Sequence, residues 1–118
     1  RAAIGFAEKH GVDPLTHVTY NAVSADGRLI DAGSRIWPNT ERLKAAIALY
    51  EVDGVDPSPV LQQTLDLLFG RYLGCQPRGA WRDAFNARGE LTARTIPAST
   101  FYHIMLAFTE VLRVQPDA

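Results

Sequence analysis

The sequence lacks several features that mark whole classes of protein. Cys75 is the only cysteine, which excludes a disulfide within the chain and is typical of the reducing cytoplasm. The 12 basic and 13 acidic residues are mixed along the 118 positions, and the net charge is −1 at pH 7. No basic run offers a surface to nucleic acid or to an anionic membrane, and no apolar stretch is long enough to span a bilayer. We therefore expect neither nucleic acid nor a membrane as partner.

Ligand-binding motifs are equally scarce. His10 and His17 are separated by Gly11 and Pro14, so they cannot lie on one helix face as a pair of metal ligands, and Cys75 adds no partner. The sequence has no G-x-S-x-G, no phosphate-binding P-loop and no G-x-G-x-x-G. It thus predicts no metal site and no cofactor.

The composition is that of one ordinary globular segment, residues 1–118, with 47% hydrophobic and 21% charged residues. Gly11 ends a first helical segment, Pro38 suits the first turn of a second, and Gly54 ends that one. We expect helices over residues 2–10, 38 to about 52, about 58 to 73 and about 98 to 114. The fold class is therefore mainly α.

Two stretches between these helices are typical of short β-hairpins. The first, residues 18–33, alternates around Asp26-Gly27, a dipeptide favoured in tight turns. The second covers residues 81–93 and leads into the last helix.

The two hairpins resemble each other in sequence. Asn21–Leu29 aligns without gaps on Asp83–Leu91, 62 residues further along, and each hairpin continues into an apolar helix. The same offset carries Glu41 onto His103. Two ionisable residues therefore occupy equivalent places in equivalent helices.

The helices differ in kind. In the third, apolar residues recur every three or four positions, which predicts one face in water. The second and fourth are apolar nearly all round, which predicts burial on more than one side. This alternation is typical of two concentric helical layers. Because four helices are few for such an inner layer, and because the chain opens inside a helical pattern, we expect a fragment of a longer protein.

His103 and Glu41 are the candidate chemical groups, and each has two interpretations. The helical period turns His103 away from the apolar stripe of its helix, so it is either a surface or capping histidine or a pocket-facing acid/base group. Glu41 either complements the positive end of its helix or faces a polar ligand. Trp37 and Trp81 either anchor the core or form a platform for a sugar ring.

Two blocks of sequence carry a family resemblance. SRIWPNTERLKAAIALYE (Ser34–Glu51) and PASTFYHIMLAFTEVL (Pro97–Leu112), with the intervening hairpin and the Trp81 segment in the same order, resemble the N-acylglucosamine 2-epimerase superfamily. That superfamily includes bacterial mannose and mannose-6-phosphate isomerases and cellobiose 2-epimerases. The resemblance implies an (α/α)6 barrel, of which this chain looks like the C-terminal third.

The resemblance also implies roles for single residues. Family catalysis uses two histidines that move a proton at C2 of a sugar through an enediol(ate), and one of them corresponds to His103. Glu41 corresponds to a carboxylate facing the sugar, while Arg35, Trp37 and Trp81 correspond to positions in the substrate-binding wall. The other family histidine lies in an H-P-G-H-x-x-E-W-like block, which this chain lacks. We therefore expect the chain alone to be inactive.

Three functions stay open from the sequence. The first is an isomerase that interconverts mannose or mannose 6-phosphate with fructose or its phosphate. The second is a 2-epimerase of an N-acylglucosamine or a disaccharide, and the third is a non-catalytic helical binding module. The two enzymes imply a sugar or sugar phosphate as the partner, a cytoplasmic location and no cofactor; a homodimer is also left open.

Overall fold

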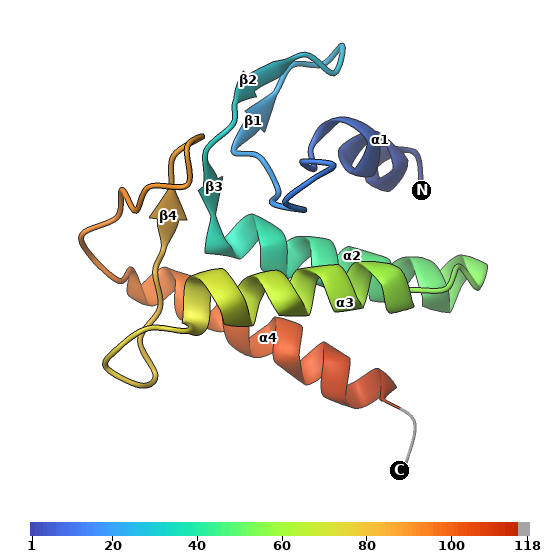
Figure 1. Ribbon diagram of the computed structural model, residues 1–118. Helices are drawn as coiled ribbons and strands as arrows, with labels where there is room; N and C mark the ends of the chain where they lie inside the picture. The colour runs from blue at the N-terminus through green and yellow to red at the C-terminus, as the bar shows by residue number, and fades with distance from the viewer. Residues whose placement is uncertain (116–118) are drawn as a thin grey trace.

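The computed structural model describes residues 1–115 and is mainly helical (Figure 1). Its elements follow the chain as α1 (Ala2–His10), β1 (Ala22–Val23), β2 (Leu29–Asp31), β3 (Ser34–Arg35), α2 (Ile36–Asp53), α3 (Ser58–Leu67), η1 (Leu68–Leu73), β4 (Ala84–Phe85) and α4 (Ala98–Val114). The expected helices 2–10 and 98–114 are confirmed, and α2 begins two residues earlier than expected. No helix within residues 1–115 is long and apolar enough to cross a membrane.

The third expected helix is two elements in the structure. Residues 58–67 form the α-helix α3, and residues 68–73 continue it as the π-helix η1. The expected amphipathic pattern is confirmed, because Leu68 and Tyr72 are buried and Leu61 and Leu65 pack against them. The π-helical segment is only 6 residues long, too short for a changed period to show in the apolar pattern, so the sequence did not predict it.

The first hairpin is confirmed. β1 pairs with β2 in antiparallel register, Ala22 opposite Asp31 and Val23 opposite Leu29. The turn is closed by the backbone N–H of Ser24, which donates to the carbonyl of Arg28 at 2.8 Å. Gly27 has a φ of 87° there, a left-handed conformation that glycine adopts without strain.

The second hairpin is shorter than expected. Its turn forms, with the N–H of Asn86 donating to the carbonyl of Glu90 at 2.9 Å, but the returning strand is reduced to one bridge between Phe85 and Leu91. β4 pairs mainly with β3, Ser34 opposite Phe85 and Arg35 opposite Ala84. This partner lies about fifty residues upstream, so a pattern of neighbouring strands could not predict it.

α2 and α4 lie side by side and run in the same direction, and α3 runs back along α2 (Figure 1). Two side-chain contacts show that the register of α2 and α4 equals the repeat offset of 62 residues: Glu41 with His103 and Glu51 with Arg113. The core lies where these helices meet β4. Its buried members are Ile36, Leu43, Ile47, Leu68, Tyr72, Phe85, Ile104 and Ala107.

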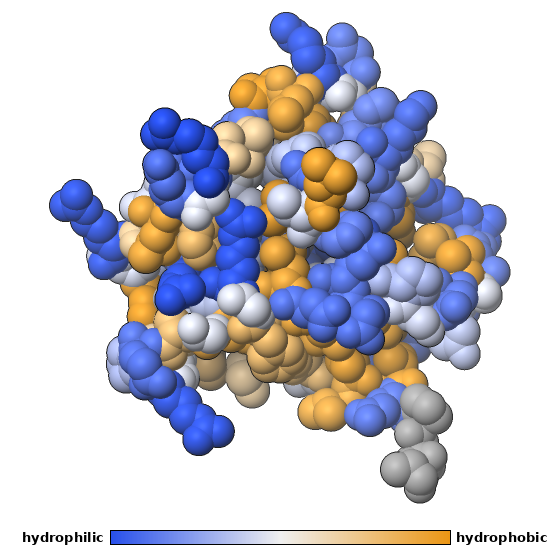
Figure 2. All heavy atoms as spheres, viewed as in Figure 1, coloured by the Kyte–Doolittle hydropathy of each residue, from blue (hydrophilic) through white to orange (hydrophobic). Residues whose placement is uncertain are grey.

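The prediction that the fourth helix is buried on more than one side is wrong for this chain. Only Thr100, Ile104 and Ala107 of α4 are buried, whereas Phe101 is 54% and Leu112 is 70% exposed. α4 packs mainly against α2, and although Phe108, Val111 and Val114 also pack against the core, the rest of its apolar face is largely exposed within residues 1–115. Figure 2 shows apolar side chains along the lower side of the molecule, where Figure 1 places α4.

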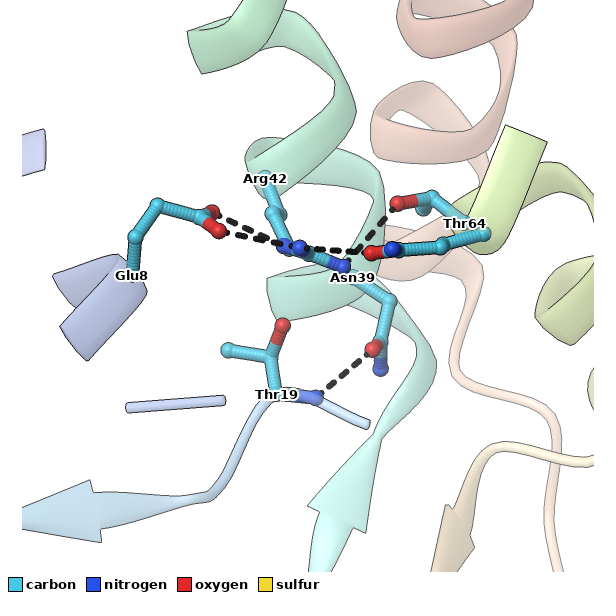
Figure 3. Close-up of polar contacts among 6 residues, drawn as sticks. Glu8, Thr19, Asn39, Arg42 and Thr64 are labelled. Atoms are coloured by element: carbon cyan, nitrogen blue, oxygen red, sulfur yellow. Dashed lines mark hydrogen bonds and ion pairs between the residues drawn. The ribbon is translucent and has the colours of Figure 1, made fainter. Parts of the chain in front are cut away.

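A buried arginine ties three helices together (Figure 3). The guanidinium of Arg42 on α2 donates to both carboxylate oxygens of Glu8 on α1, at 2.8 and 2.9 Å. It also donates to Gln63 and Thr64 on α3, at 3.2 and 3.5 Å. Arg42 is only 9% exposed, and these acceptors offset the loss of its hydration.

The start of α2 is held by a second buried polar group. Asn39 is fully buried and accepts a hydrogen bond from the backbone N–H of Thr19 at 2.9 Å (Figure 3). Its amide donates to the hydroxyl of Ser34 and to the carbonyl of Arg35. The Tyr72 hydroxyl donates to the same Ser34 oxygen at 2.8 Å. These hydrogen bonds therefore hold the first turn of α2 against Thr19, against β3 and, through Ser34, against Tyr72.

Replacing Leu43 with alanine is expected to lower the free energy of unfolding of the intact protein by about 3 kcal/mol, because the fully buried side chain leaves a cavity in the core. Urea unfolding followed by circular dichroism measures this loss. Leu15→Ala is the matched control, since Leu15 is 87% exposed and its truncation is expected to cost less than about 0.5 kcal/mol. Equal losses in the two variants would contradict the assigned core.

Candidate functional site

The two candidate groups from the sequence meet at the α2–α4 contact. Nδ1 of His103 lies 2.7 Å from Oε1 of Glu41. His103 stands in the second turn of α4 and Glu41 in the second turn of α2, so the in-register packing of the two helices brings them together. The His103 side chain is 20% exposed and that of Glu41 is 39% exposed. The pair is therefore half-buried, with part of each side chain in contact with solvent.

Lys44 completes this pair. Its Nζ also lies 2.7 Å from Oε1 of Glu41, one helical turn further along α2. Burial acts to raise the pKa of Glu41, but hydrogen bonds from Lys44 and then His103 outweigh it, so the pKa is lowered from its ordinary value. Glu41 is consequently ionised at neutral pH.

The ionised carboxylate determines which nitrogen of His103 is available. A carboxylate can only accept hydrogen bonds, so Nδ1 of the imidazole carries the proton that points at Glu41. Nε2 is then the free position, unprotonated in the neutral ring. An imidazole anchored through one nitrogen can take up and return a proton through the other.

Aromatic side chains flank the imidazole. The ring of Trp37 is 5.5 Å from that of His103 and tilted by 34°, and the ring of Tyr102 is 4.0 Å away. Trp37 is 40% exposed, so one part of its indole contacts His103 while another remains free. An exposed indole face beside an acid/base group can hold the apolar face of a sugar ring.

Trp37 also lines two hollows. One, of about 340 Å³, lies between α1 and α2 and reaches Glu41 and Arg42. The other, of about 390 Å³, is lined by Tyr20, Asn21, Asp31, Arg35, Trp37 and Pro38. Arg35 thus lines the second hollow but not the first, together with polar groups of the first hairpin.

Trp81 lies apart from this cluster. Its ring stacks on Phe101 at 6.3 Å with an interplanar angle of 23°, and its Nε1 donates to Asp83 at 3.1 Å. It also packs against the hydrophobic core. Of the five residues predicted from the sequence, the structure therefore clusters His103, Glu41 and Trp37, puts Arg35 next to Trp37, and uses Trp81 as a partner of Phe101.

The sequence did not single out Lys44 or Tyr102 as part of this cluster. Lys44 stands three residues after Glu41, a spacing at which opposite charges meet on a helix, so this signal was available. Tyr102 directly precedes His103, and adjacency in a helix does not by itself predict a ring contact. Within residues 1–115, no group of three or more histidine, cysteine, aspartate or glutamate side chains is placed to hold a metal ion.

The sequence matches the family model described as N-acylglucosamine 2-epimerase (GlcNAc 2-epimerase) over residues 2–107. One relative is the mannose-6-phosphate isomerase of Rhizobium meliloti (strain 1021), with 34% identity over 114 residues. That alignment takes in 94% of this chain and 30% of the relative. The chain therefore spans about 30% of the length of the curated relative it matches.

Solved structures of a sugar isomerase and of a sugar epimerase resemble this chain in fold. A D-mannose isomerase matches with a TM-score of 0.79 and 20% identity, over 94% of this chain and 29% of its own. A cellobiose 2-epimerase from Spirochaeta thermophila matches with a TM-score of 0.82 and 18% identity, over 98% of this chain and 31% of its own. These likenesses confirm the expected fold class, part of an (α/α)6 barrel. The match to the family model decides the family: this chain belongs to the N-acylglucosamine 2-epimerase family of isomerases and epimerases.

Proposed function

We propose that the protein carrying this chain is a sugar isomerase that interconverts an aldose and a ketose of the mannose type, with His103 as one of its acid/base groups. The observation that carries the proposal is the 2.7 Å contact between Nδ1 of His103 and Glu41, which leaves Nε2 free. The 34% identity to a mannose-6-phosphate isomerase supports the choice of reaction. Glu41 is a positioning residue that holds the imidazole in the required tautomer.

The proposed reaction moves one carbon-bound proton and one hydroxyl proton. Nε2 of His103 takes the proton from C2, and the electrons of the C–H bond form a C1–C2 double bond while the carbonyl oxygen O1 becomes an enediolate oxygen. Returning the proton to C1, while the proton of O2 passes to O1 and the C2–O2 bond becomes the carbonyl, gives the ketose. Returning it to C2 on the other face would make the epimeric aldose, so a 2-epimerase of an N-acylglucosamine or a disaccharide is the alternative function.

The second group for proton transfer is proposed to lie outside residues 1–118. This chain is then the C-terminal third of the barrel and is inactive alone. The exposed apolar side chains of α4, Phe101 and Met105 among them, support this proposal because an inner-layer helix would have neighbours there. The competing hypothesis is not an enzyme: a helical binding module that keeps the fold but does not catalyse proton transfer.

Substrate contacts are proposed for Trp37 and, around it, Arg35. The exposed part of the Trp37 indole offers a platform for the sugar ring, next to His103. Arg35 lines the hollow behind Trp37 with Asn21 and Asp31, which can accept or donate hydrogen bonds to hydroxyl groups. Trp81 is proposed to affect the substrate-binding wall only through Phe101, because it stacks on the Phe101 ring.

His103→Asn in the intact protein is expected to lower turnover about 1000-fold, because the acid/base group is lost. Mannose, mannose 6-phosphate and N-acetylmannosamine would be offered separately in heavy water and followed by NMR. Formation of fructose or its phosphate identifies the isomerase, and deuterium at C2 of an epimeric aldose identifies the epimerase. His17→Asn is the control, because His17 has a φ of 63°, which asparagine tolerates. Full activity in the His103 variant would exclude the proposed role.

Trp37→Ala is expected to raise KM about tenfold, because the ring that supports the sugar is removed. Trp37→Phe keeps an aromatic face and is expected to stay within a few fold of the wild type. Steady-state kinetics with the substrate found above measures both variants. If both variants raised KM equally, a platform role for the ring would be wrong.

A further inference from the structure

Three side chains meet on one oxygen atom at the α2–α4 contact. Nζ of Lys44 and Nδ1 of His103 both lie 2.7 Å from Oε1 of Glu41. We propose that Lys44 is a positioning residue for proton transfer: it holds the Glu41 carboxylate against His103 and offsets its negative charge, which opposes protonation of the imidazole. This inference rests on the proposed function of His103.

The physical reason is a conflict within the histidine–carboxylate pair. A carboxylate at hydrogen-bond distance orients the imidazole, but its charge also favours the protonated ring. A protonated Nε2 cannot accept the proton from C2. An ammonium group on the same carboxylate oxygen keeps the orientation and opposes the protonation, since it attracts the carboxylate and repels a positive imidazolium.

The burial of the array makes the effect of Lys44 large enough to measure. The side chains of Lys44 and His103 are only 23% and 20% exposed, so water screens their charges less than on an open surface. Within residues 1–115, Lys44 is the one lysine or arginine that forms an ion pair with Glu41. The other lysine in the sequence, Lys9, stands on α1 and is exposed.

Other charges near the array largely offset one another. On α4, Glu110 binds Arg113, which is the main reason its pKa is lowered, and the charge of Lys44 lowers that pKa a little further. On the α1 side, Glu8 is paired with Arg42. Arg35 lies in the strand before α2 and lines a hollow with Trp37. The charge of Lys44 is therefore the one whose removal would act directly on Glu41 and His103.

The test is the pH dependence of kcat/KM in the intact enzyme carrying Lys44→Met. The activity of a base rises as pH passes upward through its pKa, so a base that holds its proton more tightly moves this acid limb to higher pH. We expect a shift of about one pH unit upward. Lys44→Gln, which removes the charge but keeps a hydrogen-bond donor, is expected to shift the limb in the same direction. Lys44→Arg is expected to restore the wild-type profile, and Lys9→Met to leave it unchanged.

A second measurement does not depend on turnover. The NMR titration of His103, assigned among the histidines of the intact enzyme by the signal that the His103→Asn variant loses, is expected to move upward with the acid limb. A uniform loss of activity at every pH with an unmoved titration would show a merely structural role for Lys44 and overturn the inference. So would failure of Lys44→Arg to restore the profile.

The two proposals fail in different ways. Activity retained by His103→Asn would remove the proposed function and with it the reason for a tuned base. A different result would overturn only the role of Lys44. In that case His103→Asn loses activity, but Lys44→Met moves neither the acid limb of kcat/KM nor the NMR titration of His103.

Discussion

The in-register packing of α2 against α4 is the constraint on which the rest of the structure depends. The two helices run in the same direction, and contacts follow the 62-residue offset that relates their sequences. At two points of the contact a side chain therefore faces its equivalent: Glu41 pairs with His103 and Glu51 with Arg113. The repeat in the sequence is thus reflected in contacts between equivalent residues of α2 and α4.

This packing brings Glu41 to His103 in a fixed geometry because the start of α2 is held in place. Buried Asn39 binds the strand before the helix and the loop around Thr19, while Arg42 binds α1 and α3. These buried hydrogen bonds are costly to break, so they hold the turn that carries Trp37 and Glu41. The polar core beneath the site therefore orients the site, and the aliphatic core further along the helices supplies most of the apolar burial.

Much of the fold and part of the site could be predicted from the sequence. Gly11, Gly54 and the apolar periods determined the helix limits, since these are local effects of backbone conformation. The offset between the hairpins already placed Glu41 and His103 at equivalent positions of two helices. The long-range β3–β4 pairing and the burial of Arg42 could not be predicted, because their partners lie far away in the sequence and no local pattern records them.

The sequence by itself determined the helical class, the family and the two ionisable residues that repeat at equivalent positions. Only the tertiary structure decided that these two residues share a hydrogen bond, that Lys44 shares the same carboxylate oxygen, and that Trp81 stacks on Phe101 away from them. The physical reason is the distance along the sequence over which each interaction acts. Helix formation depends on neighbours a few residues apart, whereas the charge and the free nitrogen of His103 depend on side chains that packing brings to it from another helix.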